Sequence, residues 1–155
     1  GASRWYWRIK KNGPQSIGKS RGGWTTKIHL VAADARTAIT FALSPGHEHD
    51  APAGRQLLLA LGPVFSLTHL LMDRAYEADQ TRQLALDLGY IPVVPPKNNR
   101  LEPWEYDRAM YKKRNEIERL FRRLKGFRRI FSRFDNLDII FLAFIYFALI
   151  VEALR

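Results

Sequence analysis

The spacing of apolar residues changes repeatedly along the chain, and the order of these changes limits the possible folds more than any other feature. Apolar and polar residues alternate over 26–32 and 38–43, which predicts two strands joined by a turn at 34–37. Further along, short apolar runs alternate with stretches of helical spacing. We predict helices at 53–61, 79–88, 106–126 and 137–154, a buried strand at 67–73, and a short strand at 91–96 that prolines close. This order is α/β, with an antiparallel hairpin leading into a mixed sheet covered by helices.

The longest apolar run, residues 139–151, lies in the last predicted helix. Its thirteen residues are ended by Glu152 and are fewer than the roughly 20 that cross a bilayer. We therefore predict a helix buried in the middle of the domain, and no membrane partner.

The chain is strongly basic, with 25 Lys and Arg against 15 Asp and Glu and a formal net charge of +10. Residues 1–33 hold seven basic and no acidic side chains, and residues 108–133 hold eleven basic side chains with Glu116 and Glu118 between them. A solvated helix face would explain a shorter run, but this density, interleaved with aromatic residues, favours a nucleic-acid partner. Within the run, Arg122, Arg128 and Arg129 are candidate DNA contacts.

The stretch before residue 24 is rich in Gly, Ser and Lys and shows no periodicity. We therefore divide the chain into a basic N-terminal segment or loop at 1–23 and a single domain at 24–155.

The absence of cysteine excludes disulfides, thiolate metal sites and cysteine nucleophiles, and it favours a reducing compartment. Residues 1–11 contain no apolar core of a signal peptide. His47 and His49 lack a third ligand at a defined spacing and are a weak zinc signal. His29 and His69 fall in predicted strands and are expected to be packing or surface residues.

One polar stripe of the predicted helix at 106–126 could carry chemistry. Tyr111, Arg114, Glu118 and Lys125 fall within roughly 60° around the helix axis at about 100° per residue. Nearby Arg114 and Arg122 would favour the charged form of Glu118, which could then bind a hard cation such as Mg²⁺. Alternatively, Glu118 makes only ion pairs with residues four positions away.

Asp73 ends the predicted buried strand at 67–73, and this position favours a functional role for it. Ligands of open α/β sheets bind at the carboxyl ends of the strands. Asp73 and Glu118 could meet there and hold metal, because two-metal phosphoryl transfer needs carboxylates that converge from different elements. Tyr76, close by, could contact DNA or simply pack.

The chain resembles the DDE transposases of bacterial insertion sequences. The spacing Tyr-x₂-Arg-x₃-Glu-x₆-Lys, matched by Tyr111, Arg114, Glu118 and Lys125, is the signature of that family. Five blocks occur in the order of the "insertion sequence five" group: Gly18–His29, Leu43–Asp50, Met72–Tyr76, Ile91–Pro96 and Tyr111–Phe134. The resemblance spans about Lys10 to Leu154, nearly the whole chain.

The resemblance implies a ribonuclease-H-like α/β domain in which two aspartates and a glutamate bind two Mg²⁺, with Mn²⁺ as a substitute. Asp73 matches the second aspartate and Glu118 the glutamate. The implied reaction is cleavage at the element's DNA ends by activated water, followed by attack of the freed 3′-hydroxyl on target DNA. Tyr111, Arg114 and Lys125 would hold DNA phosphates near the cut. The resemblance also implies a homo-oligomer on transposon ends and target, and a cytoplasmic, nucleoid-associated bacterial protein.

The chain departs from the family pattern at the first catalytic aspartate. In the family that residue lies on the opening strand of the sheet, upstream of the Gly-rich loop, but no acidic residue precedes Asp34. Asp34 falls in the hairpin turn, where Asp supports local backbone hydrogen bonds, and Asp50 is expected to be the N-cap of a helix that begins near Pro52. Neither is expected to be the third ligand.

Two readings therefore stay open. The chain is either the C-terminal catalytic portion of a transposase, active when an upstream segment supplies the missing strand and its aspartate, or an inactive truncated remnant that only binds DNA. We expect residues 1–11 not to match the family, and we expect no N-terminal end-recognition domain in this chain.

Overall fold

The computed structural model describes residues 13–155. Its first sheet has three antiparallel strands in the order β1-β2-β3, with β1 at Gly18–Ser20, β2 at Gly23–Ala32 and β3 at Ala38–Pro45. The long β2–β3 hairpin pairs Ile28 with Leu43 and Leu30 with Phe41, which confirms the predicted hairpin. Asp34 stabilises its turn, because the Asp34 carboxylate accepts hydrogen bonds from the backbone N–H groups of Arg36 and Thr37, 2.8 and 2.9 Å away.

A second, parallel sheet carries the strand predicted at 67–73, although the prediction that this strand is buried was wrong, because all four of its residues are only half-buried. β4 (Thr68–Leu71) pairs with β5 (Tyr90–Val93), and α3 (Asp79–Asp87) forms the crossover between them. α2 (Asp50–Leu61) precedes β4 and packs with α3 over a core formed by Leu58, Ala85 and Tyr90. Gly89 adopts a φ of 87° at the turn between α3 and β5, which a residue with a side chain would rarely adopt.

The described strands form two sheets where the sequence predicted a single mixed one. β3 pairs with residues 26–32 of β2 and β1 with residues 23–25, and a Cβ atom added at Gly18 of β1 would lie 2.8 Å from Pro45 Cβ of β3, so both strands lie along the same edge of β2. Within residues 13–155, the other edge of β2 and the edge of β4 opposite β5 have no partner strand. Antiparallel and parallel pairing are both present, as a mixed sheet requires, but no described strand joins the two sheets.

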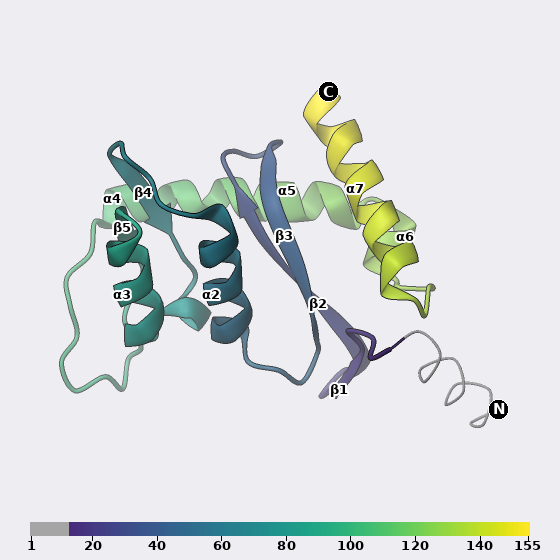
Figure 1. Cartoon of the computed structure of the whole chain (residues 1–155), viewed down its shortest axis with the longest axis horizontal. Coiled ribbons are helices and arrows are strands. Elements are labelled where there is room, and N and C mark those ends of the chain that lie inside the picture. Colours follow the sequence, from purple (N-terminus) through teal and green to yellow (C-terminus); the bar gives the residue numbers. More distant parts are fainter. Residues whose placement is uncertain (1–12) are drawn as a thin grey trace.

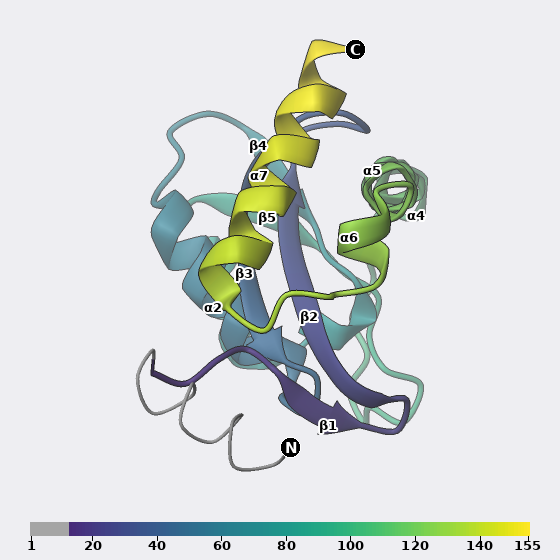
Figure 2. The same cartoon turned by 90° about the vertical axis from the view of Figure 1, so that its right-hand side faces the viewer.

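The basic tail forms one helical segment that runs across the molecule. α4 (Arg108–Tyr111), the 3₁₀ turn η2 (Lys112–Arg114) and α5 (Asn115–Lys125) follow one another without a break. The segment begins two residues later than predicted because Asp107 is its N-cap, accepting a 2.9 Å hydrogen bond from the Met110 N–H. Figures 1 and 2 show α5 and α2 on opposite faces of the β2–β3 hairpin.

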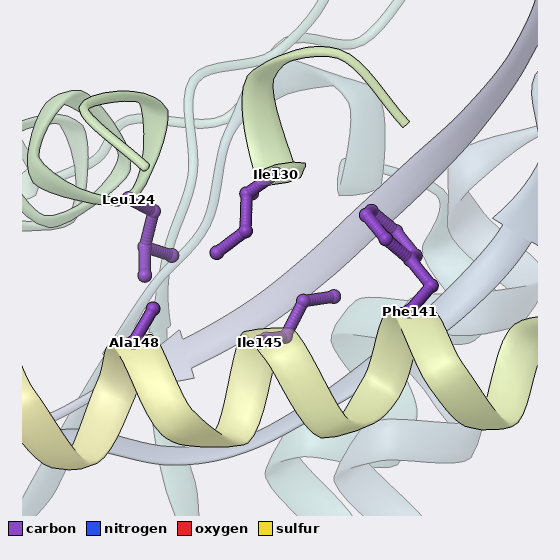
Figure 3. Packing of buried hydrophobic residues seen from close by; sticks show 5 residues of the cluster. All are labelled: Leu124, Ile130, Phe141, Ile145 and Ala148. Atoms are coloured by element: carbon purple, nitrogen blue, oxygen red, sulfur yellow. The ribbon is translucent and has the colours of Figure 1, made fainter. Parts of the chain in front are cut away.

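The last helix, α7 (Asp138–Leu154), packs against α5 and the short helix α6 (Arg128–Phe131). Figure 3 shows the resulting core, in which Phe141, Ile145 and Ala148 of α7 point toward Leu124 and Ile130. The prediction that α7 is buried in the middle of the domain was wrong. α7 lies on the outside (Figure 2), so its opposite face leaves six large apolar side chains exposed: Ile139, Ile140, Tyr146, Phe147, Ile150 and Leu154. No described helix is both long and apolar enough to span a membrane.

The two faces of α7 give a matched test of this packing. Ile145 is 0% exposed and Ile150 is 57% exposed. We expect Ile145→Ala to lower the free energy of unfolding by about 2–5 kcal/mol, because the substitution leaves a cavity in the core. Ile150→Ala should change it by less than about 0.5 kcal/mol. Urea denaturation followed by circular dichroism measures both, and equal losses would contradict the placement of α7.

Candidate active site

Asp73 lies directly beyond the parallel sheet. The Met72 N–H donates a 3.0 Å hydrogen bond to the Val93 carbonyl, which extends the β4–β5 pairing by one residue before the chain turns. Asp73 then caps the 3₁₀ turn η1 (Arg74–Tyr76), and its Oδ1 accepts a 2.7 Å hydrogen bond from the Arg74 N–H. Its side chain is 58% exposed, so the other carboxylate oxygen is available to a ligand.

Arg114 lies between Asp73 and Glu118. Its Nη2 is 2.7 Å from Glu118 Oε1 and its Nη1 is 3.8 Å from Asp73 Oδ2. The ion pair of Glu118 with a residue four positions away, the simpler reading of the sequence, is therefore present. Because the same guanidinium also reaches Asp73, the structure brings together two carboxylates that are 45 positions apart in the sequence. The positively charged Arg114 guanidinium thus lies where the Asp73 and Glu118 carboxylates converge.

A cleft of about 1160 Å³ surrounds these groups. Its walls come from β2, α2, β4 and the α4–α5 segment, and they include no residue of β3 or β5. Arg122 and Lys125 line it together with Asp73, Arg114 and Glu118. The cleft thus lies between β2 and β4 and combines apolar strand residues with a charged rim along α5.

The remaining predicted DNA contacts, Tyr111, Arg128 and Arg129, do not line the cleft. Tyr111, at the end of α4, stacks edge-to-face with Tyr106 at 5.6 Å, and the Arg114 guanidinium lies 5.5 Å from the centre of its ring. Burial raises the pKa of Tyr111, so its hydroxyl is a neutral hydrogen-bond donor. Arg128 and Arg129 belong to α6 and do not line the cleft; Arg129 lies 3.9 Å from Asp135.

Asp34 and Asp50 also line the cleft, but both are engaged elsewhere. The Asp34 carboxylate accepts the backbone hydrogen bonds of the hairpin turn, as predicted. The N-cap prediction for Asp50 was wrong, because α2 begins at Asp50 itself, with His49 as the N-cap residue. The carboxylate of Asp50 instead forms a 2.7 Å ion pair with Lys27 of β2, and its place in the first helical turn is favourable for a negative charge. Within residues 13–155, no group of three His, Asp or Glu side chains is close enough to hold a metal ion.

A polar cluster beside this site does not follow from the sequence pattern. The pattern predicts His29 to be a packing or surface residue and allows Tyr76 either to contact DNA or to pack. The structure shows that the two side chains are hydrogen-bonded at 2.7 Å, with His29 buried and Tyr76 lining the cleft. Strand periodicity could not reveal this pair, because its members are 47 positions apart.

The position of Arg114 predicts that it competes with cations. Arg114→Gln should tighten the binding of Mn²⁺ by up to about fivefold, since removing a partly exposed ion pair changes the free energy by at most about 1 kcal/mol. Arg122→Gln is the control, because Arg122 lines the same cleft without bridging the two carboxylates. Electron paramagnetic resonance of free Mn²⁺ measures the affinity, and equal effects of both substitutions would contradict a specific role for Arg114.

Comparison with known proteins agrees with this geometry. The sequence model of a family described as "Transposase DDE domain" matches residues 5–151, so the expectation that residues 1–11 do not resemble the family was wrong for residues 5–11. A protein of Brucella ovis, described as a candidate transposase for insertion sequence element IS6501, is 32% identical over 132 residues, which cover 84% of this chain and 99% of that protein. No solved structure matches the chain. A family match over almost the whole chain, together with this relative, shows that the chain belongs to the DDE transposases of insertion sequences.

Proposed function

We propose that this transposase cuts and joins DNA with Asp73 and Glu118 as two ligands of Mg²⁺, for which Mn²⁺ can substitute. Transposases of this family bind DNA and use divalent metal ions. One observation carries the proposal: both carboxylates converge on a single cationic group in a cleft at the end of β4.

The donor set fits a hard divalent cation. Carboxylate oxygens are the ligands that Mg²⁺ prefers, and the Arg114 guanidinium marks the position between them where positive charge is stabilised. Bound there, the metal would stabilise the negative charge that develops on the attacking and leaving oxygens.

A third carboxylate is part of the proposal, and the open strand edges suggest how it would arrive. The cleft lies between β2 and β4, whose facing edges lack partner strands among the described residues. We propose that a strand outside residues 13–155 pairs with these edges and carries the family's first aspartate. Such a strand would join the two sheets into the mixed sheet that the sequence predicted.

The α4–α5 segment would hold the DNA. Arg114, Arg122 and Lys125 line the cleft on one side of this helical segment, where they can contact successive phosphates, and the neutral Tyr111 hydroxyl can donate a further hydrogen bond. Arg128 and Arg129 would extend the same basic surface away from the cut. Metal binding between Asp73 and Glu118 would release the Arg114 guanidinium to contact a phosphate.

The proposed chemistry has two steps. In the first, the oxygen of a water molecule bonds to the phosphorus at the element's end, the bond to the 3′-oxygen breaks, and a proton of the water passes to that oxygen, which leaves as a 3′-hydroxyl. In the second, this hydroxyl attacks a phosphodiester of target DNA, so one phosphodiester forms as another breaks, and its proton passes to the new leaving oxygen. No covalent bond to the protein is needed in either step.

Three finer assignments belong to the same proposal. They are membership of the "insertion sequence five" group, a homo-oligomer in the active complex, and a site of action at the bacterial nucleoid. The signature residues Tyr111, Arg114, Glu118 and Lys125 support the first. The alternative hypothesis is a remnant that binds DNA without catalysis. A measurement of metal binding distinguishes the two.

Metal binding should depend on both carboxylates. We expect Asp73→Asn and Glu118→Gln each to weaken Mn²⁺ binding at least tenfold, because each removes a charged ligand. Asp87→Asn, which removes an exposed carboxylate on α3 outside the cleft, should leave the affinity unchanged. Isothermal titration calorimetry provides the measurement. Binding that survives both substitutions would contradict the metal site, and DNA binding by a wild-type protein without metal affinity would favour the remnant.

DNA affinity should depend on the cleft-lining cations. Lys125→Gln is expected to weaken binding to duplexes of any sequence and to lower the slope of log K against log salt concentration by about 1. Arg119→Gln is the control, because Arg119 lies outside the cleft and pairs with Glu116 at 2.9 Å. Fluorescence anisotropy over a KCl series measures both slopes, and an equal change for the two variants would argue against DNA binding along the cleft.

A further inference from the structure

Three of the five sequence blocks meet in one buried hydrogen-bonded chain. His29 of β2 lies between Ser44 of β3 and Tyr76 of η1, with its Nε2 2.8 Å from Ser44 Oγ and its Nδ1 2.7 Å from the Tyr76 hydroxyl. His29 and Ser44 are 3% and 4% exposed. None of the three residues is needed to hold DNA or metal in the proposed function, yet a polar cluster this deeply buried stabilises the fold only when its hydrogen bonds are satisfied.

The protonation states of His29 and Tyr76 allow both hydrogen bonds of the imidazole to form together. Burial lowers the pKa of His29, so the imidazole is neutral, with one ring nitrogen that donates and one that accepts. Burial likewise raises the pKa of Tyr76, whose hydroxyl stays protonated. A neutral imidazole can therefore bond to both hydroxyl groups at once.

Tyr76 is held from a second direction by α2. A Cβ atom added at Gly54 would lie 2.5 Å from Tyr76 Cδ1, so the aromatic ring occupies the space that a side chain at position 54 would need. The ring also stands edge-on to the His29 imidazole, with the centroids 6.2 Å apart. These contacts fix both the ring and the hydroxyl of Tyr76.

Asp73 is connected to Tyr76 through the backbone of a single turn. The Tyr76 N–H donates a 2.9 Å hydrogen bond to the Asp73 carbonyl, while the Asp73 carboxylate accepts from the Arg74 N–H. The position of Tyr76 therefore sets the position of Asp73. This link matters because β4 and β2 belong to different sheets within the described residues, so their own hydrogen bonds do not fix Asp73 relative to the hairpin.

We propose that Ser44, His29 and Tyr76 form a positioning chain that links β3 and β2 to η1 beside the cleft and holds the Asp73 carboxylate in the place where it faces Glu118. The positioning of Asp73 follows from contacts within the chain, whereas its consequence for metal binding rests on the proposed function. All three members act through Asp73 and need not touch DNA or metal.

Tyr76→Phe tests the chain because it removes only the hydroxyl and keeps the ring against Gly54. Tyr90→Phe is the control, since the Tyr90 hydroxyl likewise makes a hydrogen bond, donating to the Gly62 carbonyl 3.2 Å away in the other core. Amide hydrogen exchange followed by NMR reports on the N–H groups of Arg74, Tyr76 and Glu77, which are all hydrogen-bonded within the turn.

We expect Tyr76→Phe to accelerate exchange of these three amides by about tenfold relative to Tyr90→Phe, and to weaken Mn²⁺ binding severalfold, while both variants lose similar global stability. Gly54→Ala should produce the same local acceleration by displacing the ring, even though Ala normally stabilises a helix interior relative to Gly.

Equal exchange at residues 74–77 in Tyr76→Phe and Tyr90→Phe would overturn the positioning chain, whatever happens to metal. A wild-type protein that binds no Mn²⁺ but shows the local acceleration would leave positioning intact and refute the metal site. Accelerated exchange with unchanged Mn²⁺ affinity would overturn the claim that the chain places Asp73 for metal binding.

Discussion

The burial of Leu120 and Leu124 on one side of α5 is the constraint on which the arrangement of the site depends. Both leucines are fully buried, and Leu124 belongs to the core that α7 and the β2–β3 hairpin share. Because a helix is rigid about its axis, fixing this apolar stripe also fixes the rotation of the polar one. Glu118 is thereby turned toward the end of β4, where Asp73 lies, and Arg114 reaches both carboxylates.

The cleft between the sheets is maintained by polar links as well as by packing. Lys27 of β2 pairs with Asp50 of α2, and His29 of β2 bonds to Tyr76 of η1. These contacts join the antiparallel hairpin to the elements around β4 although the described strands of the two sheets do not pair. The site thus has a fixed geometry on its α5 and η1 sides, while the strand edges that face the cleft remain available for pairing.

Local sequence patterns predicted the elements well, because each depends on neighbours in the chain. The alternation at 26–32 and 38–43 predicted the hairpin, Asp34 predicted its turn, and the run ending in Asp73 predicted a strand with a carboxylate beyond its end, although that strand is only half-buried. The helical stripe placed Arg114 and Glu118 on one side of the helix, where they form an ion pair. The catalytic roles assigned to Asp73 and Glu118 remain predictions.

What the sequence could not predict depends on contacts between distant residues. Hydropathy alone could not tell which face of α7 would be covered, so burial was predicted all round. Asp50 was assigned to its own helix terminus, but Lys27, from a strand 23 positions earlier, binds its carboxylate. His29 looked like an ordinary strand residue because Ser44 and Tyr76, which satisfy its two nitrogens, come from other elements.

We propose that Asp73 and Glu118 bind one divalent cation in place of Arg114. Anomalous diffraction from crystals of the protein grown with Mn²⁺ tests this proposal directly. We expect a manganese peak between the two carboxylates, with the Arg114 guanidinium turned away from them. Crystals that contain Mn²⁺ but show no peak at this position, with Arg114 still bridging Asp73 and Glu118, would contradict it.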